Sequence, residues 1–174
     1  MIIDKNIPRK ERITRDRLQF IPGTQTPLMS VVEISNSGMC NRKCSFCPRS
    51  DPEYLDINEF ISKDLHTKIF SELSELKFKG MVIYSGYVEP LLDKNIYNSI
   101  SEARQFLPEA QIELITNGDV LNLERTKKLF ESGLSTLLIS VYDGPKEEEN
   151  FYKLCKDLKL GKESFFLPST ISVN

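Results

Sequence analysis

The 174-residue sequence has little that is typical of a membrane-spanning segment or a secretion signal, and we expect neither. No apolar run approaches the length of about 20 residues that a transmembrane helix needs. Residues 1–10 carry charged side chains where a signal peptide would have its apolar segment. We therefore expect no membrane association and a cytoplasmic location.

An excess of positive charge is also lacking. The 23 Lys and Arg residues are outnumbered by 25 Asp and Glu residues, which gives a formal net charge of -2. Proteins that bind nucleic acid usually carry a strongly basic surface, so we expect no nucleic-acid partner. The length and the hydrophobic fraction of 40% suit one globular domain with a buried core.

Residues that bind soft metal ions are few: one histidine and four cysteines. Three of the cysteines form a C-x3-C-x2-C pattern at Cys40, Cys44 and Cys47. Three thiols cannot all pair in disulfides, and such short loops would gain little from closure, so we expect a metal site. Zinc would need a fourth ligand, from His66 or Cys155. A cubane iron–sulfur cluster leaves one iron open when three cysteines bind it, so we favour iron–sulfur and keep zinc as the alternative.

Three basic residues lie in or beside the same loop, namely Arg42, Lys43 and Arg49. Positive charge lowers the pKa of nearby thiols and offsets the negative charge of a thiolate-bound cluster. The same residues can equally be solvated surface charges. Both interpretations stay open from the sequence.

Apolar periodicity predicts strands that begin near residues 31, 80, 111, 135 and 164, with one amphipathic helix between each pair. We expect the first helix to begin at Asp56 or Asn58 and to end at Gly80. His66 should lie on its flank, partly exposed and without a role. A helix over 146–159 places Cys155 among apolar neighbours, so we predict a core thiol there.

Strands that alternate with single helices pair in parallel through right-handed crossovers, which predicts an α/β fold. This periodicity fits both a doubly wound sheet and a partial barrel. In either case the carboxyl ends of the strands line one rim. The rim would collect the cysteine loop and residues 85–89, 116–117 and 140–143. We take residues 1–29 as an N-terminal arm and linker and residues 30–174 as the core.

Four segments, in order, resemble the motifs of the radical S-adenosylmethionine (radical SAM) superfamily. They are the cysteine loop with Phe46 before its third cysteine, the glycine-containing segment 84–92 with its Glu-Pro pair, and the strand ends 115–118 and 139–144. The resemblance covers about residues 31–144 and implies parallel (βα) repeats that form an incomplete partial TIM-type barrel.

The resemblance also implies a set of cofactor-binding residues. Cys40, Cys44 and Cys47 would each bind one iron of a 4Fe-4S cluster, and S-adenosylmethionine (SAM) would bind the fourth iron. Phe46 would pack on the adenine, Gly86 and Glu89 would surround the methionine amino group, and Asn117 and Ser140 would approach the ribose or carboxylate. Structural roles remain open for Phe46 as a loop anchor, Gly86 as a site of close packing and Glu89 as an acid at a helix N-terminus.

The implied function is a radical SAM enzyme that reductively cleaves SAM and starts radical chemistry on an unidentified peptide, sugar or small metabolite. An external electron donor such as a flavodoxin or ferredoxin would supply the electron. We assign no catalytic side chain. The alternative is a non-catalytic zinc or iron–sulfur module, or an inactive fragment.

Two departures from the family pattern affect these expectations. Val88 stands where the family often has a second glycine before the glutamate, so we expect weaker SAM binding. The sequence also ends near its fifth strand, with an apolar stretch over 165–173 and no following helix. We therefore expect a core truncated after the fifth strand, and either self-association or a partner that supplies the C-terminal part.

Overall fold

The structure is a computed structural model that describes residues 7–8, 11, 15, 18–161 and 164–167. Residues 1–6, 9–10, 12–14 and 16–17 of the expected N-terminal arm lie outside the described residues, as does the expected apolar end at Ile171 and Val173. None of the described helices is long and apolar enough to cross a membrane.

Among the described residues, five strands form one parallel sheet, in the same order as along the chain. They are β1 (Val31–Ile34), β2 (Met81–Tyr84), β3 (Gln111–Thr116), β4 (Thr136–Ile139) and β5 (Phe165–Phe166). A doubly wound sheet would reverse its strand order at a switch point. The unbroken order instead gives a singly wound, open sheet with β1 and β5 at its edges, which confirms the predicted partial barrel.

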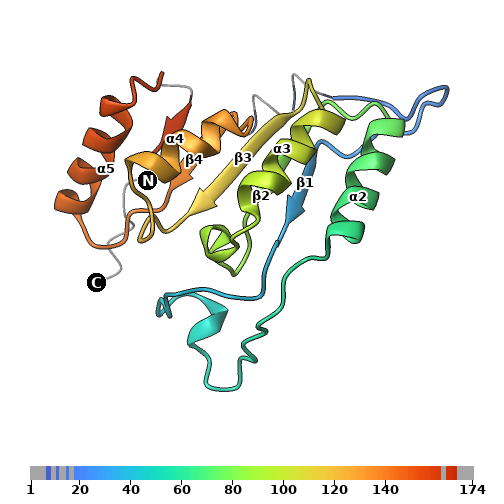
Figure 1. Cartoon of the computed structure of the whole chain (residues 1–174). Helices are drawn as coiled ribbons and strands as arrows, with labels where there is room; N and C mark the ends of the chain where they lie inside the picture. The colour runs from blue at the N-terminus through green and yellow to red at the C-terminus, as the bar shows by residue number, and fades with distance from the viewer. Residues whose placement is uncertain (1–6, 9–10, 12–14, 16–17, 162–163, 168–174) are drawn as a thin grey trace.

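Four α-helices connect the strands: α2 (Lys63–Glu75), α3 (Ile96–Phe106), α4 (Leu123–Glu131) and α5 (Pro145–Asp157). Figure 1 shows them in chain order along the sheet, with α3 and α4 over the strands on the side that faces the viewer. Two single 3-10 turns, η1 (Pro48–Ser50) and η2 (Pro90–Leu92), lie in the loops that follow β1 and β2.

The core lies between the sheet and the helices. Alternate strand residues point toward the helices because successive side chains of a strand lie on opposite faces. Tyr84, Leu114 and Leu137 are therefore buried in one cluster with Phe70 of α2 and Leu129 of α4. Burial of each large apolar side chain contributes about 1.5–3 kcal/mol, so this layer holds the strand ends in fixed positions.

The first helix begins later than the sequence predicts. Its N-cap is Ser62, whose hydroxyl accepts a hydrogen bond from the backbone N–H of Leu65 at 3.2 Å. The segment before it runs extended beside the end of β1, where the N–H of Ile61 donates to Asn36. The expected cap at Asp56 or Asn58 was wrong because this non-local pairing holds the residues out of a helix.

The predicted end of that helix was also wrong. Helix α2 ends at Glu75, and Lys77 then adopts a positive φ of 53°, so the chain turns three residues before Gly80. Gly80 has another role, since a Cβ there would lie 2.4 Å from the carbonyl oxygen of Ser30. Its missing side chain lets β2 begin close to the start of β1.

His66 is buried, and the expected partly exposed side chain was wrong. It is 2% exposed because α2 packs against α3 and β2. One ring nitrogen lies 2.6 Å from Glu102 of α3 and the other 2.9 Å from the hydroxyl of Tyr84. Cys155 is fully buried in the core, as predicted, and burial raises the pKa of its thiol to about 11.

Candidate functional site

The cysteine loop follows β1 at the carboxyl end of the sheet. It has few backbone hydrogen bonds of its own. The N–H of Cys47 donates to the carbonyl of Cys44 at 2.9 Å, and the N–H of Arg42 donates to the Cys40 sulfur at 3.4 Å. Just before the loop, the N–H of Glu89 donates to the carbonyl of Met39 at 2.7 Å, which attaches the loop to the end of β2.

The three loop thiols are free and partly buried. Burial raises the pKa of the Cys44 thiol, the Arg42 charge acts to lower it, and the thiols of Cys40 and Cys47 raise it further. Cys44 thus has both other thiols within electrostatic range. Within the described part of the chain, no three His, Cys, Asp or Glu side chains converge closely enough to bind a metal ion as they stand.

The chemistry of these thiols fits an iron–sulfur cluster. Soft thiolates are the usual ligands of iron in such clusters, and a shared cationic centre removes the repulsion between neighbouring thiolates. The other soft ligands lie elsewhere. His66 lies in the helix layer with both ring nitrogens in contact with partners, and Cys155 lies in the core. The described structure therefore brings no fourth soft ligand to the loop for a closed zinc site.

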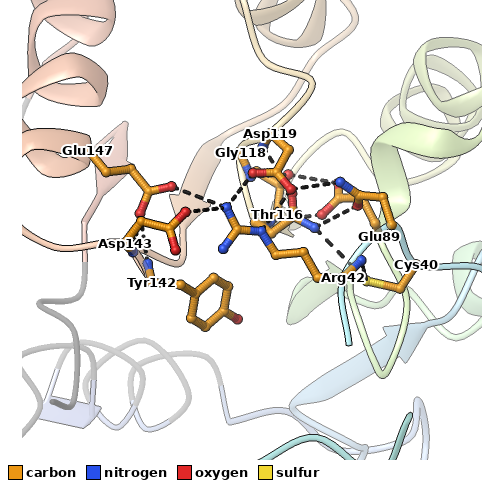
Figure 2. Close-up of polar contacts among 11 residues, drawn as sticks. Cys40, Arg42, Glu89, Thr116, Gly118, Asp119, Tyr142, Asp143 and Glu147 are labelled. Carbon is orange, nitrogen blue, oxygen red and sulfur yellow. Dashed lines mark hydrogen bonds and ion pairs between the residues drawn. The ribbon is translucent and has the colours of Figure 1, made fainter. Parts of the chain in front are cut away.

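Glu89 connects the ends of two strands. Its side chain is 1% exposed, and its carboxylate accepts hydrogen bonds from the Thr116 hydroxyl at 2.7 Å and the Asn117 N–H at 2.8 Å. It also accepts from the N–H of Leu91 and so caps η2. Burial raises the pKa of Glu89 above its usual value, although the three donors act to lower it. Figure 2 shows the carboxylate pointing toward Thr116.

Asn117 continues this connection to the cysteine loop. Its side-chain amide donates to the Asn41 oxygen at 2.8 Å and lies 4.0 Å from the Cys40 sulfur. Its own oxygen accepts the N–H of Asp119 at 3.0 Å. The end of β3 therefore contacts the loop directly beside its first cysteine.

Gly86 follows β2 and lies against Ser35, which follows β1. Its φ of 120° disfavours any side chain, and a Cβ there would lie 2.3 Å from the Ser35 hydroxyl oxygen. That hydroxyl donates to the carbonyl of Ser85 at 3.0 Å. Close packing thus accounts for the glycine at this position, whether or not Gly86 also contacts a cofactor.

Phe46 and Ser140 complete the predicted set on the same rim. The Phe46 ring is 62% exposed and packs on Tyr142 with 5.6 Å between ring centroids. Ser140 follows β4, and its N–H donates to the carbonyl of Thr116 at 2.8 Å. The fold thus brings the sequence-predicted residues to one rim, and their roles toward SAM stay predictions.

The structure gives the three basic residues of the loop, Arg42, Lys43 and Arg49, three different environments. Arg49 is 4% exposed and donates to the carbonyls of Gly38 and Tyr87, at 3.0 Å and 3.2 Å. It also forms an ion pair with Asp56. Lys43 is a solvated charge, 72% exposed and 3.9 Å from Asp56. Arg42 is held by carboxylates.

The carboxylates around Arg42 were not predicted as a group from the sequence. The Arg42 guanidinium forms ion pairs with Asp119, Asp143 and Glu147 (Figure 2). Asp119 follows β3, while Asp143 and Glu147 follow β4 and lie near the start of α5. A signal was present, since acidic residues directly after the carboxyl ends of parallel strands meet on one rim.

The chain resembles characterised proteins over much of its length. It is 31% identical over 121 residues to the S-adenosyl-L-methionine-dependent 2-deoxy-scyllo-inosamine dehydrogenase of Niallia circulans, which covers 70% of this chain and 48% of the relative. A GTP 3',8-cyclase of Staphylococcus haemolyticus is 30% identical over 115 residues, 63% of this chain and 33% of the relative. The match thus spans about half the length of the first relative and about a third of the length of the second.

A solved structure shows the same fold. The crystal structure of BtrN in complex with AdoMet and 2-DOIA matches with a TM-score of 0.70 and 28% identity, over 80% of this chain and 56% of that one. The model of the Radical SAM superfamily matches residues 34–165. Because this match spans most of the chain, the protein belongs to the radical SAM superfamily of enzymes, which use a 4Fe-4S cluster and S-adenosylmethionine as cofactors.

Proposed function

We propose that this chain carries the SAM-cleaving part of a radical SAM enzyme and holds its 4Fe-4S cluster through Cys40, Cys44 and Cys47. One observation carries the proposal. Three free, partly buried thiols occupy a single loop, and that loop is attached to the ends of β2 and β3 by Glu89 and Asn117. When bound, the cluster supplies the electron that breaks a carbon–sulfur bond of SAM.

The described residues would then orient SAM rather than react with it. We propose Gly86 and Glu89 beside the methionine amino group, Asn117 and Ser140 beside the ribose or carboxylate, and Phe46 against the adenine. The contacts of Glu89 support a further, indirect role in SAM binding. Its carboxylate accepts three internal hydrogen bonds and so holds the ends of β2 and β3 in position. Such residues fix the geometry of a bound cofactor and exclude water from it.

We propose a sugar or another small metabolite as the substrate. The names of the similar proteins support this choice, since they describe a 2-deoxy-scyllo-inosamine dehydrogenase, a GTP 3',8-cyclase and a biotin synthase. Because the chain spans about half the length of the first of these, we propose cofactor binding for the residues given and substrate turnover for the whole protein.

Radical SAM enzymes generally need an external reductant. We propose a flavodoxin or ferredoxin as the donor and a cytoplasmic location. The four free cysteines support the location, because thiols persist in a reducing compartment.

Iron and sulfide analysis after anaerobic reconstitution tests the proposal. We expect about four irons and four sulfides per chain, loss of both in Cys40→Ala, Cys44→Ala and Cys47→Ala, and retention in the matched control Cys155→Ala. Circular dichroism of each variant shows whether the fold is kept. Tight binding of one zinc ion per chain, or loss of the cluster from a folded Cys155→Ala variant, would contradict the proposal.

A further inference from the structure

Side-chain contacts across the rim determine where the cysteine loop lies. The loop has few backbone hydrogen bonds of its own, so these contacts carry most of its attachment. Two adjacent loop residues reach Asp119 beyond β3. The Asn41 amide donates to Asp119 at 2.7 Å, and Arg42 donates through Nε to the same carboxylate oxygen at 2.7 Å. A second Arg42 nitrogen pairs with the other oxygen of Asp119, so the contact is bidentate.

The same guanidinium reaches the turn after β4. Arg42 lies 2.9 Å from Asp143 and 3.4 Å from Glu147. The other oxygen of Glu147 accepts the backbone N–H groups of Tyr142 and Asp143, each at 2.8 Å, and so holds this turn in shape. Figure 2 shows Arg42 between the residues of the two strand ends. One side chain of the loop therefore links the ends of β3 and β4.

Tyr142 gives the loop a second attachment. The Arg42 guanidinium lies over the Tyr142 ring, 5.2 Å from its centroid, and the Phe46 ring packs on the same residue at 5.6 Å. Arg42 precedes Cys44 by two residues and Phe46 follows it by two. The middle cysteine is thus fixed from both sides by contacts with one tyrosine.

Burial indicates which of these ion pairs matter. The side chains of Arg42 and Glu147 are 18% and 15% exposed and that of Asp119 is 30% exposed, whereas Asp143 is 66% exposed and its contribution is weakened by solvent. The Arg42 hydrogen bond, the largest effect, lowers the pKa of Asp119 below its usual value. The bidentate pair with the half-buried Asp119 therefore accounts for most of the attachment.

The net charge of Arg42 and its carboxylate partners favours a positioning role for Arg42 over an electrostatic one. Three carboxylates surround one guanidinium, so the group as a whole keeps a negative charge. The Arg42 charge alone acts to lower the pKa of Cys44, but the four groups together bring no net positive charge to a thiolate-bound cluster. Its planar fork does what an ammonium group cannot, because it binds a carboxylate with two parallel hydrogen bonds and stacks on an aromatic ring at the same time.

We propose that Arg42 is a positioning residue for SAM binding, which fixes Cys44 relative to the ends of β3 and β4. This proposal rests on the proposed function, since it concerns the loop that would hold the cluster. Arg42 touches neither cofactor in this account and acts only through the loop and Tyr142.

The test compares Arg42→Gln and Arg42→Lys with Lys43→Gln, a neighbouring solvated cation, as the matched control. Each reconstituted protein is titrated with SAM, and the change in the resonance signal of the reduced cluster is followed. We expect wild-type iron content in all three, with the half-saturating SAM concentration raised about tenfold in Arg42→Gln, which loses a charge-assisted bidentate contact. Arg42→Lys should recover less than half of this loss, and Lys43→Gln should match the wild type.

Asp119→Asn provides a second, independent measurement. If Arg42 acts through Asp119, the double variant Arg42→Gln/Asp119→Asn should bind SAM no more weakly than the weaker single variant, because both changes break the same Arg42–Asp119 contact. Wild-type SAM binding by Arg42→Gln, additive losses in the double variant, or loss of the cluster from a folded Arg42→Gln protein would each overturn the proposal. Failure of the proposed function is distinct, since the wild-type chain itself would then show no cluster or no response to SAM.

Discussion

The carboxylate of Glu89 accepts the backbone N–H of Asn117 at 2.8 Å, and this hydrogen bond joins the end of β2 to the end of β3. The backbone N–H of Glu89 also binds the residue before Cys40, and the side chain of Asn117 binds the residue after it. The first cysteine is thus held from two strands at once.

Glu89→Gln should destabilise the fold. The new amide nitrogen would face a backbone donor, the N–H of Leu91 or of Asn117, and a buried donor without an acceptor costs about 1–3 kcal/mol. Urea unfolding measures the change in the free energy of unfolding. Glu131→Gln is the control, because Glu131 is 61% exposed in a surface ion pair with Lys127. An unchanged urea midpoint for Glu89→Gln would refute the connecting role of this carboxylate.

The carboxylate of Glu102, which contacts His66 and Thr67, should make stability depend on pH. Burial acts to raise the pKa of Glu102, but hydrogen bonds from Thr67 and His66 outweigh it, so its pKa in the folded protein lies below the usual value. A lowered pKa means that the contribution is present above the unfolded value of about 4.3 and is lost as the pH falls through the folded value.

Glu102→Gln should therefore be less stable than the wild type near neutral pH and should approach it in acid. Urea unfolding at several pH values from 7 down to the onset of acid unfolding measures this difference. A constant difference in the free energy of unfolding at all pH values would show that Glu102 does not titrate differently on folding.

The four cysteines should differ in reactivity toward an alkylating reagent. The three loop thiols are partly exposed, whereas Cys155 is 0% exposed and its pKa is raised to about 11, so little of it is thiolate near pH 8. Mass spectrometry of the native, cluster-free protein should find labels on Cys40, Cys44 and Cys47 only, and a fourth label after unfolding in urea. Rapid labelling of Cys155 in the native protein would contradict its burial and the packing of α5 against the core.

Val88→Gly should strengthen SAM binding. Val88 is partly buried directly before Glu89. We expect its side chain to limit the approach of SAM to the backbone there. A SAM titration of the reduced cluster compares the half-saturating concentrations of the two proteins. An unchanged value would mean that the valine points away from the ligand and that the alignment of this segment with the family is shifted by a residue.

The sequence predicted the strands well, because β2 and β4 are mostly apolar runs of the kind that a sheet covered on both faces requires. Met81–Tyr84 and Thr136–Ile139 are buried throughout. The position of the site followed from topology, since the carboxyl ends of parallel strands share one rim. Cys155 was recognised as a core residue from its helical spacing alone.

Features that depend on contacts between distant segments were not predicted. The start of α2 depends on a bridge between Ser37 and Phe60, and the burial of His66 depends on the packing of α2 against α3. Arg42 meets Asp119 and Glu147 across 77 and 105 residues of sequence, so local patterns could not pair them. The sequence indicated which residues lie on the rim, but not which of their side chains form ion pairs or hydrogen bonds with one another.

Electron paramagnetic resonance of the reduced, reconstituted chain, with and without added SAM, tests whether this chain holds a cluster that binds SAM. We expect the signal of a 4Fe-4S cluster that changes on addition of SAM, because three cysteines leave one iron open to that ligand. A complete cluster whose signal is the same with and without saturating SAM would contradict this expectation.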